Sequence, residues 1–243
     1  MEQVLELKHI HYAYHTLEGE TPALTDISFA LNKGEFVSIV GPSGCGKSTL
    51  FSLMTKNLAP GRGKILLNGR NIRDMQLSEF ARKVSIVHQY NTSSDDITVE
   101  RLVGFGRTPH RKLFSGYGEE DTRLIEWAME VTHIDGYRER EVSRLSGGQR
   151  QRVWIAMALA QNTKILFLDE PTTYLDIRYQ IDILKLIQKL NREYNITIVM
   201  VLHDINQAIH FSDRIIGLWG GKVIVDGEPG QVMSTESMQK LYG

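Results

Sequence analysis

The chain has 243 residues, of which 42% are hydrophobic and 23% charged, and its formal net charge at pH 7 is -1. This composition is typical of a globular domain and lacks the basic surplus of a protein that binds nucleic acid through bulk charge, so we expect no nucleic-acid partner. Cys45 is the only cysteine, which excludes an intrachain disulfide, and the longest apolar run, residues 196–202, is too short to span a bilayer.

The N-terminal part of the chain reads as a series of short strands. Apolar or alternating stretches predict strands at residues 4–7, 12–14, 27–31, 36–40 and 65–67. Turn residues separate the strands, as in Asn32-Lys33-Gly34 and Asn68-Gly69. We therefore expect an antiparallel β-layer in this part of the chain.

Farther along, buried strands alternate with helices. Continuous apolar runs are typical of strands covered on both faces in a parallel sheet, and three occur, at residues 84–87, 165–168 and 196–202. Apolar residues at three- and four-residue spacing predict a helix from Ile177 to Leu190. This alternation predicts an α/β fold. Residues 90 to about 145 hold only helical patterns and loops, and we interpret them as a helical subdomain inserted into the core.

A phosphate-binding loop is the first motif that carries chemistry. Residues 41–49 match the P-loop pattern and lie between a predicted strand and a helical stretch, as that motif requires. Glycines let backbone N–H groups turn inward, and the helix that begins there favours an anion. Lys47 is expected to reach the β- and γ-phosphates of ATP, and the Ser48 hydroxyl to ligate Mg²⁺. The loop consists of Gly41, Pro42, Ser43, Gly44, Cys45, Gly46, Lys47, Ser48 and Thr49.

Cys45 lies inside this loop, close to the N-terminus of a helix. Such a position can lower the pKa of a thiol. The prediction is that a bulky thiol reagent inactivates the protein and that Mg-ATP protects it. A buried, inert cysteine is the alternative.

The strand at residues 165–168 ends in two carboxylates, Asp169 and Glu170. Ligands bind at the carboxyl ends of the strands in an open parallel sheet. We expect Asp169 to hold Mg²⁺, directly or through water, and Glu170 to orient or deprotonate the attacking water. Acids often end strands at solvent without any such role, but the phosphate-binding loop favours the functional interpretation.

A second anion site is predicted at Ser146, Gly147, Gly148 and Gln149. Ser146 is a good N-cap for the helix that follows, and the glycines expose backbone N–H groups at its positive end. One nucleotide has no evident use for both anion sites of one chain. A head-to-tail pair of chains would use both, with Ser146 of each copy facing the phosphate-binding loop of the other. From this segment alone, a plain capped helix is an equal alternative.

Taken together, these motifs resemble the ABC-type ATPases. Residues 145–149 match the LSGGQ signature of that family, and the other motifs follow in the family's order over essentially the whole chain. The resemblance implies a P-loop NTPase with a RecA-like core and an N-terminal antiparallel β-layer. It also implies a single domain over residues 1–243. The core would span about 1–89 and 160–243, and the helical subdomain about 90–159.

The resemblance also implies roles for single residues. Gln89 would contact Mg²⁺ or water, Asp176 would act across the dimer, and His203 would hold the γ-phosphate. Tyr14 is similar to the aromatic residue that stacks on adenine, and Tyr12 is the competing choice.

Two positions depart from the pattern of the family. Tyr174 stands before the Leu175-Asp176 pair, where many members have a small residue, and Tyr179 stands where members often have histidine. The first departure leaves the local dimer contact open.

Finer resemblance indicates what the ATPase drives. Residues 150–161, 169–177 and 201–208 are similar to the ATPases of bacterial iron–siderophore importers, a group shared with haem and cobalamin importers. The resemblance implies a peripheral subunit at the cytoplasmic face of the membrane that works with transmembrane permease subunits and, indirectly, with an extracytoplasmic substrate-binding protein. A haem or cobalamin importer and a soluble ABC ATPase are the alternatives, and the chelate itself cannot be read from this subunit.

Overall fold

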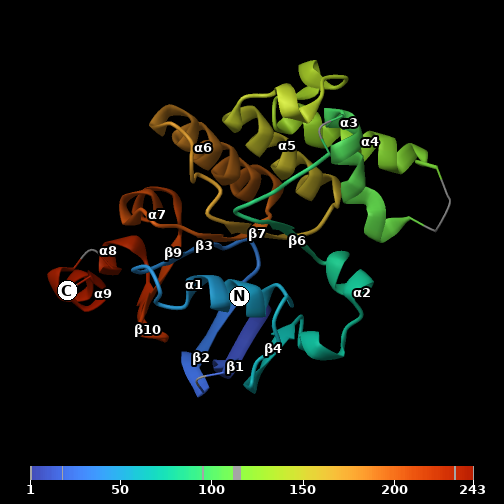
Figure 1. Ribbon diagram of the computed structural model, residues 1–243. Helices are drawn as coiled ribbons and strands as arrows, with labels where there is room; N and C mark the ends of the chain where they lie inside the picture. The colour runs from blue at the N-terminus through green and yellow to red at the C-terminus, as the bar shows by residue number, and fades with distance from the viewer. Residues whose placement is uncertain (1, 18, 95, 112–115, 233, 243) are drawn as a thin grey trace. The chain divides into compact units, whose positions relative to one another are not determined.

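The computed structural model describes residues 2–17, 19–94, 96–111, 116–232 and 234–242 (Figure 1). The chain forms two compact units. The first, called unit 1, comprises Met1–Met75 and Leu190–Gly243, and the second, unit 2, comprises Gln76–Lys189. The predicted helical subdomain lies within the range of unit 2, although residues 95 and 112–115 of it lie outside the described residues.

The first sheet of unit 1 is antiparallel and has the strand order β2-β1-β4-β5 (Figure 1). Its strands are β1 (Gln3–Thr16), β2 (Gly19–Asn32), β4 (Arg62–Leu67) and β5 (Arg70–Asn71). The sequence predicted shorter strands because polar residues interrupt the apolar pattern. In the structure, β1 continues past these polar residues by means of a bulge at His9, whose φ is 48°. Nδ1 of His9 lies 2.8 Å from Oδ1 of Asp26 in β2.

The second set of strands in unit 1 surrounds β3 (Phe36–Val40). Strand β3 pairs in parallel with β8 (Thr197–Val201) and β9 (Arg214–Trp219), and β9 pairs antiparallel with β10 (Lys222–Gly227). Every residue of β3 and β8 is buried, as the continuous apolar run at residues 196–202 predicted for β8. Residues 36–40 were expected in the antiparallel layer, and this prediction was wrong, because β3 pairs in parallel with both of its neighbours. The helical elements of unit 1 are α1 (Lys47–Met54), η1 (Ile72–Asp74), α7 (Ile205–Phe211), α8 (Pro229–Val232) and α9 (Thr235–Tyr242).

Unit 2 combines a parallel strand pair with helices. Strand β6 (Val84–Val87) pairs with β7 (Ile165–Asp169), and the register sets Val87 beside Leu168. The helical elements are α2 (Leu77–Ala81), α3 (Val99–Gly104), η2 (Phe105–His110), α4 (Glu119–Val131), η3 (Asp135–Tyr137), η4 (Val142–Arg144), α5 (Gly147–Ala160) and α6 (Ile177–Tyr194), whose last residues belong to unit 1. Helices α3, α4 and α5 pack on one another (Figure 1).

Arg107, a buried residue of η2, joins these helices. Its Nε donates to Oδ1 of Asp121 in α4 at 2.7 Å, and its Nη1 donates to the carbonyl oxygen of Ala160 at the end of α5 at 2.9 Å. The mixed architecture confirms the predicted α/β fold with an antiparallel N-terminal layer. Among the described residues, no helix has the length and apolar character needed to cross a bilayer.

Candidate functional site

The predicted phosphate-binding loop connects β3 to α1 in unit 1. Gly41 and Gly46 have φ angles of 148° and 107°, in the region that favours glycine. Close neighbours also exclude a side chain at both positions. A Cβ on Gly41 would meet the carbonyl oxygen of Leu218, and one on Gly46 would lie 2.7 Å from Cδ2 of Leu24. The backbone of the loop is therefore held in a shape that only glycine permits at these two points.

Lys47 is the charged group of this loop and is buried. Its Nζ donates to the carbonyl oxygens of Gly41 and Pro42, at 2.8 Å and 2.9 Å. The ammonium group thus lies over the curve of the loop, at the positive end of α1, which is a suitable place for a bound anion. Ser43, Gly44 and Ser48 are exposed, whereas Cys45 and Thr49 are buried.

The pKa of the Cys45 thiol is shifted in the direction opposite to the one that its position in the sequence predicted. Burial, the largest effect, raises its pKa, and the nearby charge of Lys47 and backbone hydrogen bonds only partly oppose it. The expectation of a lowered pKa was wrong because proximity to a helix N-terminus says nothing about desolvation. The alternative of a buried cysteine fits the structure better.

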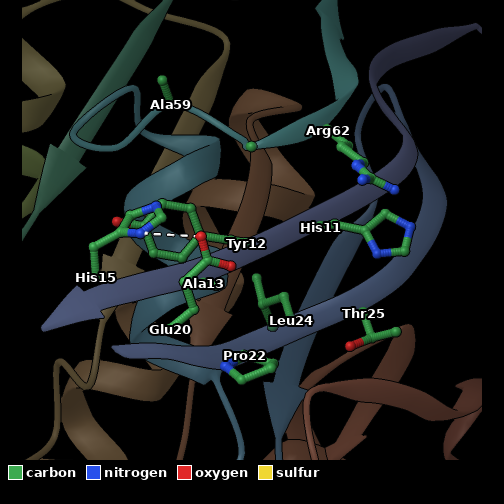
Figure 2. Close-up of a pocket in the computed structure, with 11 residues that line it drawn as sticks. His11, Tyr12, Ala13, His15, Glu20, Pro22, Leu24, Thr25, Ala59 and Arg62 are labelled. Atoms are coloured by element: carbon green, nitrogen blue, oxygen red, sulfur yellow. Dashed lines mark ion pairs between the residues drawn. The ribbon is translucent and has the colours of Figure 1, made fainter. Parts of the chain in front are cut away.

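Tyr14 and Tyr12, the two candidates for stacking on adenine, have different surroundings in the structure. The hydroxyl of Tyr14 lies 3.0 Å from Oγ1 of Thr49, and its ring is partly exposed. The two tyrosine rings meet edge to face with centroids 5.0 Å apart. Tyr12 instead lines an open groove of about 650 Å³, which also holds the ion pair of His15 with Glu20 (Figure 2). Tyr14 is thus the tyrosine tied directly to the phosphate-binding loop.

His203 follows β8 and is exposed. The N–H group of Leu202 donates to the carbonyl oxygen of Ile39 at 3.0 Å, so the ends of β8 and β3 lie side by side. The next residue, Asp204, caps α7 by accepting a hydrogen bond from the backbone of Asn206. Unit 1 therefore brings His203 to the same end of the parallel strands as the phosphate-binding loop.

The predicted catalytic carboxylate lies in unit 2. Glu170 follows β7, is buried, and has a φ of 48°. Its Oε2 accepts hydrogen bonds from Nε2 of Gln89 at 2.6 Å and from Oγ1 of Thr173 at 3.2 Å. Asp169 is the last residue of β7. The structure thus brings Gln89 and Glu170 together, and it adds Thr173, which no motif had marked and whose only signal was its closeness to Glu170.

The second predicted anion site forms the start of α5. Oγ of Ser146 accepts from the backbone N–H of Gln149 at 3.3 Å, and Oε1 of Gln149 accepts from that of Ser146 at 2.9 Å. This capping box confirms Ser146 as the N-cap. Gly148 packs closely on the ring of Tyr179, because a Cβ there would lie 3.0 Å from Cδ1.

Residues just before α6 complete the site in unit 2. Asp176 is exposed, and its carbonyl oxygen accepts the backbone hydrogen bond of Gln180 at 3.0 Å. Gly147 lies near Leu175, since a Cβ on this glycine would be 3.3 Å from Cδ2 of Leu175. Unit 2 thus contains the signature residues 145–149, Asp176, Gln89 and the carboxylates of Asp169 and Glu170. Unit 1 holds the phosphate-binding loop, Tyr14 and His203.

Known proteins with similar sequences and structures identify the family. The ABC transporter family matches residues 24–173, more than half of the chain. The petrobactin import ATP-binding protein FpuC of Bacillus anthracis is 41% identical over 240 residues, which are 99% of this chain and 87% of that protein. The ferric enterobactin transport ATP-binding protein FepC of Escherichia coli (strain K12) is 42% identical over 225 residues, 93% of this chain and 83% of that protein.

A solved dimeric structure of a bacterial ABC transporter cassette superimposes with a TM-score of 0.81 at 32% identity, covering 93% of this chain and 98% of that one. This chain is therefore similar to ABC transporter cassettes in its P-loop NTPase fold as well as in its sequence. The chain therefore belongs to the ABC transporter family, as an ATP-binding cassette of the iron–siderophore importer type.

Proposed function

We propose that this chain is the ATP-hydrolysing subunit of a membrane importer for an iron–siderophore complex. One observation carries the proposal: two relatives of about 40% identity, matched over nearly the whole chain, are named for the import of petrobactin and the transport of ferric enterobactin. Because these are different chelates at similar identity, the proposal extends to the class of cargo and not to one siderophore.

The nucleotide would bind to the phosphate-binding loop of unit 1. Lys47 and the inward backbone N–H groups would contact the phosphates, His203 would hold the γ-phosphate, and Tyr14 would stack on adenine. The bond between Tyr14 and Thr49 supports this choice, because it ties the ring to the loop.

A magnesium ion fits the chemistry of the proposed ligands. Ser48, Asp169 and Gln89 offer hydroxyl, carboxylate and amide oxygens, the hard donors that Mg²⁺ prefers. The amide of Gln89 uses its nitrogen to donate to Glu170, which leaves its carbonyl oxygen for a cation. The ion would neutralise charge that develops on the phosphates.

Glu170 would act on the attacking water as the general base. Its carboxylate is buried and fixed by two hydrogen-bond donors, so its orientation is set before any substrate binds. Gln89 is in turn placed at the end of β6, beside β7, by the parallel pairing of these strands.

Two copies of the chain would close head to tail on ATP. Ser146, Gly147, Gly148 and Gln149 of one copy would face the γ-phosphate on the loop of the other, and Asp176 would contact the opposite copy. The structural likeness to a dimeric cassette supports this arrangement. So does the exposed helix start at Ser146, whose capping box is made by residues of this segment alone and whose exposure leaves it accessible to a second copy.

The cassette would act at the cytoplasmic face of the membrane, docked on permease subunits that receive cargo from an extracytoplasmic binding protein. The names of the relatives as import and transport ATP-binding proteins support the permease partner. We further propose that residues 1–243 act as one ABC ATPase domain with a helical subdomain at about 90–159.

Uptake in a deletion strain tests the proposal. Such a strain should grow normally with abundant iron and poorly when iron is supplied only as one siderophore, and its uptake of that radiolabelled ferric siderophore should fall. Wild-type protein should restore uptake, whereas the Glu170→Gln variant should not. If every siderophore enters normally while haem or cobalamin uptake fails, the cargo assignment is wrong. If translation or DNA repair fails in place of uptake, the importer assignment is wrong as well.

A further inference from the structure

Two exposed tyrosines form an unexpected pair beside the proposed catalytic carboxylate. The hydroxyl oxygens of Tyr90 and Tyr174 lie 2.7 Å apart, and their ring centroids are 6.0 Å apart. The side chains are 68% and 79% exposed, so burial of apolar surface does not explain their position. The contact between the two side chains is what keeps these rings together.

The backbone at Tyr174 is strained for a residue of its type. Its φ of 64° is in the left-handed region, which is unfavourable for a bulky side chain. Glu170, four positions earlier, also has a positive φ. The short segment 170–174 is thus held at both ends in a conformation that needs support from its surroundings.

The hydrogen bond between Tyr90 and Tyr174 is next to a second hydrogen bond that joins the same two chain segments. Gln89 and Tyr90 are consecutive residues after β6, and they bind Glu170 and Tyr174 respectively. One hydrogen bond leaves the segments able to turn about it, whereas two bonds at neighbouring positions fix their relative orientation.

We propose that Tyr90 and Tyr174 are positioning residues for ATP hydrolysis: their bond holds the segment 170–174 against the segment that follows β6 and so keeps Glu170 directed toward the attacking water. The inference rests on the proposed function, since it takes Glu170 to be the general base. Neither tyrosine is assigned a contact with the nucleotide. The pair acts through Glu170 and Gln89.

The variants Tyr90→Phe, Tyr174→Phe and the double variant test the pair. Each removes a hydroxyl and keeps the ring, and both sites are exposed, so folding should be unaffected. In the assembled importer, kcat for ATP hydrolysis should fall on the order of 2- to 10-fold, the usual effect of one hydrogen bond. KM and the Kd for ATP should stay unchanged. The double variant should be no slower than either single variant, because all three lose the same bond.

Two controls keep this experiment separate from the test of the function. Tyr137→Phe makes the same change elsewhere in unit 2, at a hydroxyl that forms no hydrogen bond among the described residues, and it should match the wild type. Glu170→Gln should stop hydrolysis. If Glu170→Gln is inactive while the tyrosine variants hydrolyse at the wild-type rate, the positioning role is wrong and the proposed function stands. Additive losses in the double variant, or a loss of ATP binding with kcat unchanged, would also overturn it. If Glu170→Gln is active, the proposed base itself is wrong.

Discussion

The chain contains two helix N-termini predicted to bind phosphate, and they are built differently. Helix α1 has Gly46 as its N-cap and no side-chain cap, and the buried Lys47 lies at its start. Helix α5 has the exposed Ser146, which forms a capping box with Gln149. The first end leaves its N–H groups to a ligand, whereas the second already satisfies part of its own.

This difference indicates a division of work between the two ends. The α1 end combines a helix N-terminus that has no side-chain cap with the full positive charge of Lys47, so we expect it to bind nucleotide within one chain. The α5 end has no lysine or arginine among Ser146 to Gln149, although Nη1 of the next residue, Arg150, donates to the carbonyl oxygen of Leu145 at 2.7 Å. We expect it to bind phosphate only when a second chain presents it. Binding, pairing and hydrolysis should therefore be separable by substitution.

The largest effect is expected at Glu170, which belongs to neither helix end. Glu170→Gln keeps the shape of the side chain and removes the basic carboxylate, so hydrolysis should fall on the order of 10²–10⁴-fold. ATP binding at the α1 end should persist, and the variant should accumulate as an ATP-bound dimer. Lys47→Ala should have the opposite profile, with weakened nucleotide binding. Rates are measured with the permease present, and near wild-type turnover of Glu170→Gln would contradict the assignment.

The next largest effect concerns the anchor at the far end of α5. Arg107 and Asp121 form an ion pair at 2.7 Å with side chains only 4% and 14% exposed. Removing one partner of a buried pair is costly, so Arg107→Ala should lower the free energy of unfolding by about 3–5 kcal/mol. Arg138 offers a matched control, since its ion pairs with Glu100 and Glu126 are more exposed. Arg138→Ala should lower the free energy of unfolding by less than about 1 kcal/mol. Urea titrations of the two variants and the wild type measure both losses.

The same ion pair gives a pH dependence with a definite sign. Burial opposes ionisation of Asp121, but hydrogen bonds from Arg107 and from the N–H of Gly118 outweigh it and lower the pKa of the carboxyl. A lowered pKa stabilises the fold at pH values above the ordinary aspartate pKa of about 3.9, and this stabilisation is lost as the pH falls through the folded-state value. The gap in stability between wild type and Asp121→Asn should therefore shrink below about pH 4. A constant gap would show that the charge of Asp121 is not what stabilises the pair.

A smaller effect should follow from a charge placed at the α5 end. Ser146→Asp retains a good N-cap but sets a carboxylate against the γ-phosphate of the other copy, and Ser146→Asn is the neutral control with the same capping ability. We expect ATP-driven pairing to weaken more than about 30-fold for Asp and little for Asn. The effect of a substitution at Gly148 on pairing would be harder to interpret, because a side chain there would also displace Tyr179.

Mixed dimers sharpen this test of pairing. A dimer of Ser146→Asp and Lys47→Ala chains has one composite site with both defects and one with neither. Some ATP-dependent pairing should survive in the mixture and be absent from each pure variant, as seen by size-exclusion chromatography with light scattering. Equal failure of all three samples would count against the head-to-tail arrangement, while leaving ATP binding intact.

The smallest effect is expected at Cys45. Because burial raises its pKa, alkylation of the native protein at neutral pH should be slower than that of a free cysteine, and unfolding in urea should expose the thiol. Mass spectrometry of timed samples measures the rate. Rapid native labelling that Mg-ATP suppresses would restore the reactive thiol that the sequence suggested.

Three strands of the parallel pairings were predictable because their signals are local. The runs at residues 84–87, 165–168 and 196–202 correspond to β6, β7 and β8 within a residue or two, since burial on both faces demands continuous apolar sequence. Strands β1 and β2 were predicted only in pieces, because a bulge at His9 changes the alternation that marks a strand. Strands β9 and β10 went unpredicted.

The site was predictable as a set of residues and not as an arrangement. Motif spacing pointed to Ser146 as a cap, and its capping box follows from local sequence. The bond between Gln89 and Glu170 joins residues 81 positions apart and depends on the pairing of β6 with β7. The pKa of Cys45 depends on the packing around it, which no local pattern encodes. Local sequence patterns thus do not predict the pairing of distant strands or the desolvation of buried groups.

The close neighbours of the glycines in the phosphate-binding loop have a consequence for genetics and engineering. Leu24 of β2 and Leu218 of β9 press on Gly46 and Gly41, and Gly221 in the following turn bonds to Cys45 and Thr25. The curvature of the loop therefore depends on residues that lie outside the loop itself. A screen for altered ATP affinity should recover substitutions in this outer frame, and a designer who wants to tune affinity without disturbing catalysis has these positions to vary.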